Sequence, residues 1–295
     1  MKVFITGSSS HLAQALLPRL CNDKDIERVS GLDIRPSRFH HPKFFPVIED
    51  IRSRRLQARL LGHDALIHMA YVVLRGRMSE QTMRSVNVDG TLQLFSTARE
   101  VGISRLINLS SAAVYGSGTM LKEEAVFNPL PDFLYAAHKV DVERRLKKIA
   151  PHIIQLRPHI ILGPCAQPLL KQLLRLPFYI KLADPQPRLQ AVHESDVANA
   201  IMLALRTTGQ GAFNLAPDDS LSFYDMMYLR RNFNIGITPE LASTLVNLAW
   251  RLTGWGGETA WVQGANNSLT CDNGRAKTVL GWQPIYTTEQ VIKSC

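Results

Sequence analysis

The chain has 295 residues, 45% of them hydrophobic, and a formal net charge of +9. That length allows a large buried core, or a nucleotide-binding domain with a smaller lobe. The N-terminus shows no charged segment, apolar run and cleavage site in series, and the most apolar late stretch, residues 241–252, is too short to span a bilayer. We therefore expect a cytosolic (cytoplasmic) protein with no membrane partner, in which residues 241–252 form a core-packing helix.

The charge and the cysteines narrow the possible partners. Lys and Arg are spread widely, with clusters at residues 52–59 and 144–148 that fit solvated helix faces. A basic balance also suits a phosphate-bearing cofactor or substrate. No nucleic-acid motif accompanies the charge, so we do not expect nucleic acid as a partner. The four cysteines, at positions 21, 165, 271 and 295, are far apart and unpaired in sequence, which favours free thiols over a disulfide framework or a metal site.

Apolar, β-branched runs alternate with helical patterns through the first two-thirds of the chain. The apolar runs predict strands at residues 3–6, 29–32, 45–47, 65–70, 105–110 and 153–157. Helical patterns cover residues 12–20, 79–101 and 134–149. Strands separated by helices of this length form right-handed βαβ units, which build a doubly wound parallel sheet. The sequence therefore predicts an α/β fold of the Rossmann type.

The pattern changes after about residue 163. Prolines cluster at positions 164, 168, 177, 185 and 187, so the chain there is looped. We predict a dinucleotide-binding Rossmann domain over residues 1–163, to which residues 189–217 return. Residues 164–295 would mainly form a smaller, C-terminal substrate-binding lobe.

The first strand runs directly into a turn, TGSSSHLA at residues 6–13, and then into a helix. In dinucleotide folds such a turn places helix N-terminal amides against the pyrophosphate. Glycine usually occupies three positions there. Only Gly7 is present, while Ser10 and Ala13 stand at the other two. The turn alone does not separate a cofactor site from an ordinary strand–turn–helix.

Asp33 ends the second predicted strand. An acid placed about 20 residues after the turn accepts hydrogen bonds from the adenosine ribose and repels a 2′-phosphate, which favours NAD over NADP. Arg35 and Arg38 lie close by and could hold that phosphate, so NADP stays open. A simple turn cap is the competing interpretation of Asp33.

Hydroxyl groups follow the fifth predicted strand at Ser111, and Tyr135 and Lys139 open the helix at residues 134–149. Positions i and i+4 share a helix face, so Tyr135 and Lys139 point to one side. The Lys139 ammonium would lower the pKa of Tyr135 from about 10, letting Tyr135 exchange a carbinol proton while hydride moves to or from a nicotinamide. Ser111 would hydrogen-bond the same substrate oxygen. Taken alone, YxxxK also fits a surface Tyr and Lys on an amphipathic helix.

Seven segments, in order, resemble the extended short-chain dehydrogenase/reductase family, in its NAD-dependent epimerase/dehydratase group. They are HMA at 68–70, NVDGT at 87–91, SSAAVYG at 110–116, YAAHK at 135–139 with Glu143, RPHIILGP at 157–164, HESDVA at 193–198 and RAKTVLGWQP at 275–284. His138 replaces the usual Ser of the YxxSK segment. The likeness runs almost end to end.

The resemblance implies a role for each matching position. Ser111, Tyr135 and Lys139 would be catalytic, and Lys139 would also contact the nicotinamide ribose. The cofactor would be held by Gly7, Ser10, His11, Leu12, Asp33, Asp50, Ile51, Met69, Ala70, Asn87, Tyr135, Lys139, Pro158 and Ile161. A structural role competes with a functional one at Asn87, His193, Asp196 and Trp282. The resemblance also implies a homodimer, formed through the helices at 79–101 and 134–149.

The substrate segment departs from the family pattern. Family members that act on nucleotide-diphosphate sugars commonly carry an Arg where Leu189 stands here, and Arg188 is one position early. Lys171, Arg175 and Lys181 could still meet a diphosphate. The apolar residues around them would suit a less polar carbonyl or hydroxyl compound, or simply be core: Leu169, Leu170, Leu173, Leu174, Leu176, Phe178 and Tyr179.

We predict an NAD(P)-dependent oxidoreductase or epimerase that acts on a nucleotide sugar or another small hydroxyl or carbonyl substrate. The alternative is a dinucleotide-binding sensor or regulatory protein without turnover. The altered glycine turn favours the alternative, whereas the intact Ser111, Tyr135 and Lys139 set argues against it.

Overall fold

A seven-stranded, fully parallel sheet organises the structure, a computed structural model that describes residues 1–166, 178–182, 185–229, 235–253 and 260–295. The strand order is β12-β7-β5-β4-β1-β2-β3. These strands are β1 Lys2–Thr6, β2 Arg28–Asp33, β3 Phe44–Ile48, β4 Ala65–His68, β5 Arg105–Leu109, β7 Ile154–Pro158 and β12 Gly211–Leu215. The order reverses between β1 and β4, which is the switch point where such sheets bind ligands.

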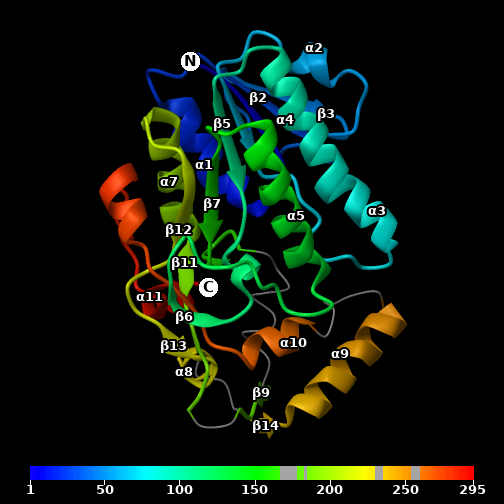
Figure 1. The fold of residues 1–295 in the computed structure, drawn as a ribbon, viewed down its shortest axis with the longest axis vertical. Coiled ribbons are helices and arrows are strands. Elements are labelled where there is room, and N and C mark those ends of the chain that lie inside the picture. Colours follow the sequence, from blue (N-terminus) through cyan, green and yellow to red (C-terminus); the bar gives the residue numbers. More distant parts are fainter. Residues whose placement is uncertain (167–177, 183–184, 230–234, 254–259) are drawn as a thin grey trace.

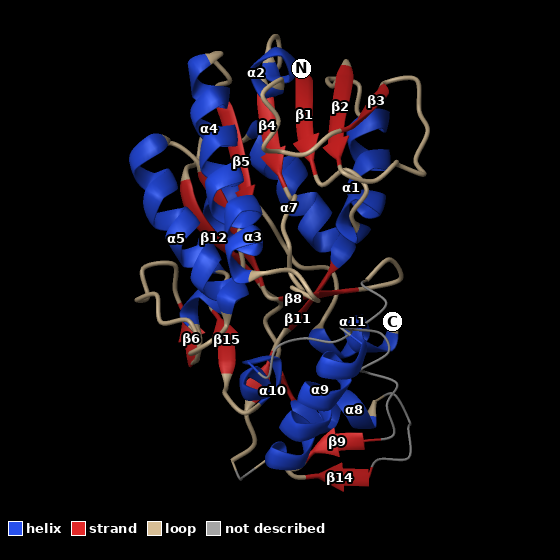
Figure 2. Ribbon diagram, turned by 90° about the vertical axis from the view of Figure 1, so that its right-hand side faces the viewer, coloured by secondary structure: helices blue, strands red, loops and turns tan. Residues whose placement is uncertain are grey.

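Helices cover both faces of this sheet (Figures 1 and 2). On one face lie α1 His11–Asn22 and α7 Glu194–Arg206, whose apolar sides share a core with the sheet. On the other face lie α2 Leu56–Leu60, α4 Thr91–Glu100 and α5 Leu134–Ile149, around a second apolar core. Burial of both sheet faces is what the continuous apolar strands require. The predicted α/β, doubly wound fold is confirmed.

The long helical stretch predicted at residues 79–101 has an unpredicted interruption. It runs as α3 Glu80–Arg84, a π-helical segment η1 Ser85–Gly90, and α4. Ser79 begins it by accepting a hydrogen bond from the Thr82 amide. π-Helical turns inside helices often mark functional sites, and this one carries the buried Asn87.

The remaining elements lie mainly beyond the carboxyl ends of the strands, which point toward the smaller lobe (Figure 2). Short strands from distant segments pair there. A four-stranded sheet has the order β13-β10-β15-β6, and β11 pairs with β8 and β14 with β9. Their bounds are β6 Gly118–Leu121, β8 Ile160–Leu162, β9 Phe178–Ile180, β10 Arg188–Leu189, β11 Ala191–His193, β13 Leu221–Ser222, β14 Ile235–Ile237 and β15 Leu269–Cys271. The helices are η2 Ala112–Tyr115, α8 Phe223–Tyr228, α9 Pro239–Thr253, α10 Ala260–Ala265, η3 Ala276–Leu280 and α11 Thr288–Lys293. The proposed domain boundaries stay a prediction.

The prediction of a core-packing helix at residues 241–252 is wrong in one respect. The helix exists as α9, but its leucines are between 46% and 69% exposed: Leu241, Leu245, Leu248 and Leu252. Their 4-3-4 spacing sets them along one line of the helix, which faces outward. The inward side carries Ala242, and the Trp250 indole donates to the Gly76 carbonyl at 2.9 Å.

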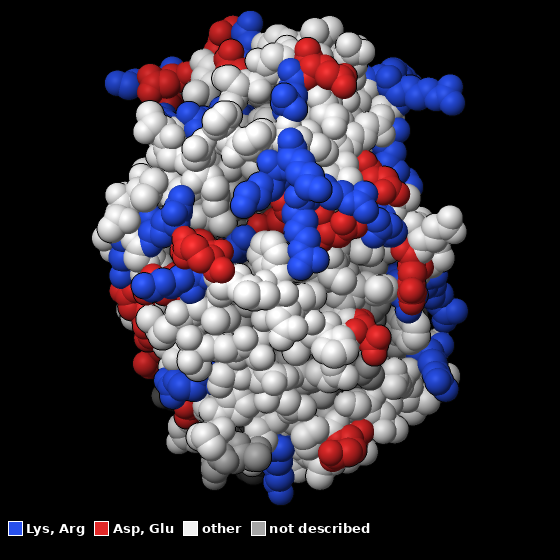
Figure 3. Space-filling view, viewed as in Figure 1, with Lys and Arg blue, Asp and Glu red and all other residues white. Residues whose placement is uncertain are grey.

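The surface charge is uneven. On the face seen in Figure 3, Lys and Arg gather over the upper half, around the large sheet and its helices, and the lower half carries few charged side chains. In the part of the chain that the structure describes, no helix is long and apolar enough to cross a membrane. Cys21 and Cys271 are buried thiols, and burial raises the pKa of Cys271 to about 12.

Candidate active site

The predicted catalytic side chains meet at the carboxyl end of β5. Ser111 follows this strand and caps η2, and Tyr135 and Lys139 lie one turn apart at the start of α5. Ser111 hydrogen-bonds the Tyr135 side chain. The Lys139 ammonium donates to the Leu109 carbonyl at 2.6 Å. The structure thus brings together the three residues that the sequence singled out, while their chemical roles remain a prediction.

Lys139 is a buried lysine with only 4% of its surface exposed. Burial lowers the pKa of Lys139 to about 7, and the charge of Glu143 acts in the opposite direction. Its Nζ lies 3.5 Å from the ring centroid of Tyr71 and 5.8 Å from that of Tyr135. Sequence analysis missed Tyr71. The available signal was its position, directly after the HMA segment at the end of β4, where the chain enters the site.

The expected effect of Lys139 on Tyr135 is not seen in this structure. Burial raises the pKa of Tyr135 above its ordinary value of 10, and the hydrogen bond with Ser111 only partly offsets this. The reason is placement, since Lys139 Nζ lies over the aromatic rings and against the Leu109 carbonyl. Tyr135 is therefore a neutral phenol here.

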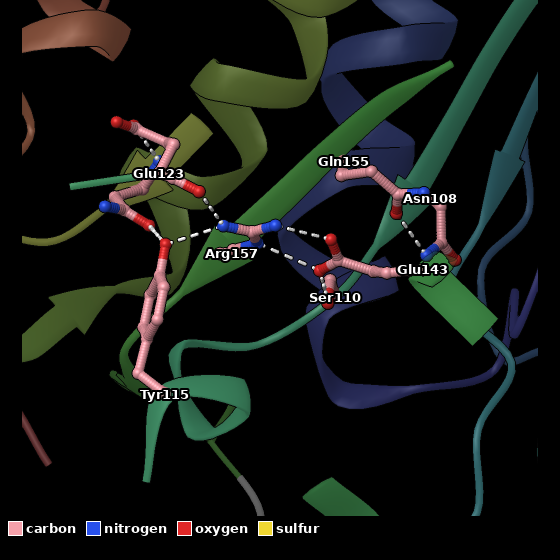
Figure 4. A network of polar contacts seen from close by, with 8 residues as sticks. Asn108, Ser110, Tyr115, Glu123, Glu143, Gln155 and Arg157 are labelled. Atoms are coloured by element: carbon pink, nitrogen blue, oxygen red, sulfur yellow. Dashed lines mark hydrogen bonds and ion pairs between the residues drawn. The ribbon is translucent and has the colours of Figure 1, made fainter. Parts of the chain in front are cut away.

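A buried polar network supports this cluster from behind (Figure 4). Arg157, on β7, pairs with Glu143, on α5, through bonds of 2.6 and 2.9 Å. The Ser110 hydroxyl donates to the same carboxylate. Arg157 also donates to the Tyr115 hydroxyl at 2.7 Å, which in turn donates to Asn214 at 2.8 Å. The network therefore fixes α5, which carries Tyr135 and Lys139, to the ends of β5 and β7.

The turn after β1 has the close approach that a dinucleotide turn needs. Gly7 has φ +74°, and a Cβ there would lie 2.7 Å from the Ala70 nitrogen and 2.8 Å from the Met69 carbonyl carbon. Only glycine combines this backbone conformation with so little space. Ser10 caps α1 by accepting from the Ala13 amide at 3.3 Å, and its own O–H stays available as a donor. The turn fits a phosphate at the start of α1.

Asp33 lies beside this turn and is buried. Its carboxylate accepts from the Ser9 amide and from the Arg35 amide, both at 3.0 Å. The turn-cap interpretation therefore describes real contacts. A carboxylate has about four acceptor positions, so a fixed Asp33 can still accept from ribose hydroxyls. Arg35 is exposed, with its Nε 3.8 Å from Asp33.

The other predicted cofactor positions lie either in the apolar core or in partly buried surroundings and at strand ends. Ile51 is buried in the core, and the Asp50 carboxylate is paired with Arg52 at 2.7 Å, which lowers the pKa of Asp50. Leu12 and Met69 are buried, His11 and Ala70 are half-buried, Pro158 ends β7, and Ile161 lies within β8. These side chains shape the site more than they offer polar groups to a ligand.

Asn87 and His68 anchor the chain that leaves β4. The Asn87 amide accepts from the Val72 nitrogen at 2.8 Å and donates to the Val72 oxygen at 2.9 Å. His68 bridges Thr6 and Thr91 at 2.7 and 2.8 Å. Burial lowers the pKa of His68 to about 3, so the ring stays neutral. Both side chains use their polar atoms within the protein, which is a structural role.

His193, Asp196 and Trp282 also make structural contacts. His193 caps α7, and Asp196 accepts from the backbone amides of residues 285 and 286. The Trp282 indole donates to the Asp196 carbonyl at 2.8 Å. These bonds tie the C-terminal segment to α7, and so to the large sheet.

Arg188 is exposed, and its guanidinium is engaged by a neighbouring residue. Its guanidinium donates to the hydroxyl and the carbonyl of Ser220, while Leu189 beside it is buried. Lys181 is exposed near Gly236. Tyr179 is half-buried and packs against an apolar cluster of the lobe. The other substrate-lobe predictions lie outside the described residues: Leu169, Leu170, Lys171, Leu173, Leu174, Arg175 and Leu176, and the side chain of Phe178.

The doubly wound sheet, with Ser, Tyr and Lys at its carboxyl edge, defines a Rossmann-type protein of the short-chain dehydrogenase kind. The model of the NAD dependent epimerase/dehydratase family matches residues 3–216. The chain belongs to this family. The predicted family, the enzyme class and NAD as the cofactor are thereby confirmed.

Individual relatives are more distant. The chain is 23% identical over 308 residues to the uncharacterized protein y4nG of Sinorhizobium fredii, covering 98% of this chain and 76% of that protein. It is 25% identical over 150 residues to a 4-hydroxy-2-methyl-3-oxo-4-farnesyl-3,4-dihydroquinoline-1-oxide ketoreductase of Stigmatella aurantiaca, covering 47% of this chain and 42% of the ketoreductase.

Among solved structures, MoeE5 in complex with UDP-glucuronic acid and NAD is similar, with a TM-score of 0.81 and 20% identity. The match covers 100% of this chain and 97% of MoeE5. At this identity the likeness shows the fold.

Replacing Glu143 with Gln should destabilise the protein by about 3–5 kcal/mol, because it leaves the Arg157 charge buried and uncompensated. Urea unfolding measures the change. The matched control is Glu289→Gln, which breaks an exposed i,i+4 pair with Lys293 and should cost under about 0.5 kcal/mol. Equal stability losses for the two variants would contradict a supporting role for the Arg157–Glu143 pair.

NADH should bind at least about tenfold more tightly than NADPH, because the Asp33 carboxylate repels a 2′-phosphate. Asp33→Asn should reduce this preference for NADH over NADPH, and the exposed Glu289→Gln should leave the preference unchanged. Fluorescence titration of the reduced nicotinamide measures both affinities. A clear preference for NADPH would mean that Arg35 or Arg38 dominates instead.

Proposed function

We propose that this protein transfers hydride between NAD and a carbinol or carbonyl carbon of a small substrate, with Tyr135 as the proton-exchanging residue. The observation that carries the proposal is the cluster at the end of β5, where Tyr135 is hydrogen-bonded to Ser111 beside the buried ammonium of Lys139. A neutral phenol next to a cation is a suitable proton donor to an alkoxide and, in reverse, a base toward a carbinol.

Each residue then has a task in the step. When a carbonyl is reduced, its carbon gains hydride and its oxygen takes the Tyr135 proton; oxidation returns both. Ser111 donates to the same oxygen and holds it in place. Lys139, whose Nζ lies 5.8 Å from the Tyr135 ring centroid, is proposed to stabilise the phenolate that forms only in this step. The nicotinamide cofactor, when bound, would supply the hydride as NADH in reduction and accept it as NAD in oxidation, and Gly7, Ser10 and Asp33 are the residues proposed to hold it.

A nucleotide sugar is the first candidate for the substrate. Its support is the fold likeness to MoeE5, whose solved complex contains UDP-glucuronic acid. A small ketone or aldehyde is the second candidate. It is favoured by the engagement of Arg188 with Ser220, by the buried Leu189 beside it, and by the likeness of half of the chain to the Stigmatella ketoreductase.

Tyr135→Phe should reduce turnover by about 10²–10⁴-fold, because it removes the exchangeable proton while keeping the ring. NADH affinity should change less than about twofold, since the hydroxyl is proposed to act on the substrate. Substrates are found by following the absorbance of reduced nicotinamide with the wild-type protein. The control is Tyr228→Phe, at a largely exposed ring on α8.

Turnover that persists in Tyr135→Phe would reject Tyr135 as the proton-exchanging residue. Wild-type protein that binds NADH tightly, yet turns over neither nucleotide sugars nor small carbonyl compounds, would favour a dinucleotide-binding sensor.

A homodimer in the cytosol completes the proposal. The segment α3–η1–α4 and helix α5 lie side by side on the outer layer (Figure 1), where Asp141 pairs with Arg84 and Arg145. Light scattering after size-exclusion should give twice the 33.1 kDa chain mass. Ala137→Arg, at an exposed position of α5, should shift the protein toward monomer. A wild-type protein that is monomeric at all concentrations would exclude this interface.

A further inference from the structure

We propose that Tyr71 is a positioning residue for Lys139: the face of its ring holds the ammonium against the Leu109 carbonyl, beside Tyr135. Three contacts carry this inference. Lys139 Nζ lies 3.5 Å from the Tyr71 ring centroid. The Tyr71 and Tyr135 rings meet edge to face, with centroids 5.6 Å apart. Lys139 also donates to Leu109 at 2.6 Å.

The hydrogen-bond donors of the Lys139 ammonium explain why an aromatic ring suits this position. A lysine ammonium has three N–H groups and no acceptor. One N–H bonds to the Leu109 oxygen, and the negative face of the Tyr71 ring attracts the charge from a distance well inside the usual limit of about 6 Å. An aromatic face constrains the ammonium without forming a competing hydrogen bond of fixed direction. A donor thus stays available for the cofactor ribose.

The other titratable groups that face Lys139 give it less support. Glu143, on the same helix, is engaged by Arg157 and Ser110. His68, on β4, is neutral because burial lowers its pKa to about 3. Burial also raises the pKa of Tyr71 and of Tyr135, so neither supplies a phenolate. Beside the Leu109 carbonyl, the Tyr71 ring face is therefore the side-chain contact that favours the charged form of Lys139.

The Tyr71 backbone is rigidly held, as a positioning role requires. Asn87 binds both the nitrogen and the oxygen of the next residue, Val72, at 2.8 and 2.9 Å. The residue before it, Ala70, donates to Thr6 at 3.4 Å. The π-helical segment η1, which carries Asn87, thus fixes the ring opposite α5.

The contribution of the Tyr71 hydroxyl can be tested separately from that of the ring. It is buried and has no hydrogen-bond partner in the part of the chain that the structure describes. Removing an unsatisfied buried hydroxyl costs little or stabilises. Tyr71→Phe therefore keeps the proposed contact, while Tyr71→Leu removes it.

The test measures the pKa of Lys139 directly and needs no substrate. Protein labelled with ¹³C at the lysine ε-carbons is titrated by NMR, and the Lys139 signal is assigned by its loss in Lys139→Met. Tyr71→Leu should lower the pKa of Lys139 by about half a unit or more, because a cation–π contact favours the charged form. Tyr71→Phe and the distant control Tyr228→Leu should titrate like wild type.

An unchanged Lys139 titration in Tyr71→Leu would overturn the proposal, as would equal shifts in the Leu and Phe variants. Circular dichroism and NADH binding check folding, and Tyr71→Met replaces Tyr71→Leu if the latter does not fold. The inference rests on the proposed function for its use in turnover: the alkaline fall of activity should move to lower pH in Tyr71→Leu. Failure of Tyr135 as the proton-exchanging residue would show in Tyr135→Phe and leave the NMR result intact.

Discussion

Burial of a lysine ammonium is the constraint around which this site is built. A charge taken out of water is costly unless nearby groups compensate for it. Here the compensation comes from the Leu109 carbonyl, from the ring face of Tyr71 and from the charge of Glu143 one turn further along α5. The first two are parts of the large sheet or follow it directly. The placement of Lys139 therefore depends on how α5 is docked onto the carboxyl ends of the strands.

That docking depends on a second buried charge pair. Arg157 and Glu143 join β7 to α5, and Ser110 joins the same carboxylate to the end of β5. A buried ion pair contributes little net stability compared with apolar packing of the same volume. Its value here is directional, because bidentate bonds set the rotation of α5 and so the side to which Tyr135 and Lys139 point. Tyr135, Lys139 and Glu143 occupy successive turns of α5.

Features with a local cause were predictable from the sequence. The bounds of α5 were predicted correctly, since an amphipathic pattern defines it, and Gly7 marked its turn through a backbone conformation that other residues avoid. Features set by residues far apart in the sequence were not predictable. The Tyr71 contact, the neutral state of Tyr135 and the outward leucines of α9 all depend on the tertiary packing between distant segments. The π-helical segment, whose Asn87 side chain bonds to the Val72 backbone, is likewise not indicated by helix propensity.

The same distinction separates the two halves of the proposed site, one for the cofactor and one for the substrate. The cofactor half consists of strand ends and turns that are continuous in sequence, so each position carries its own signal. The substrate half is assembled from two- to four-residue strands of distant segments, as in the pairing of β10 with β13 and β15. Arg188 shows the consequence, because its contact with Ser220 arises only when those strands meet. Substitutions in the lobe can therefore change which substrate is accepted without touching Ser111, Tyr135 or Lys139, and so a family match fixes the chemistry of this chain more firmly than its substrate.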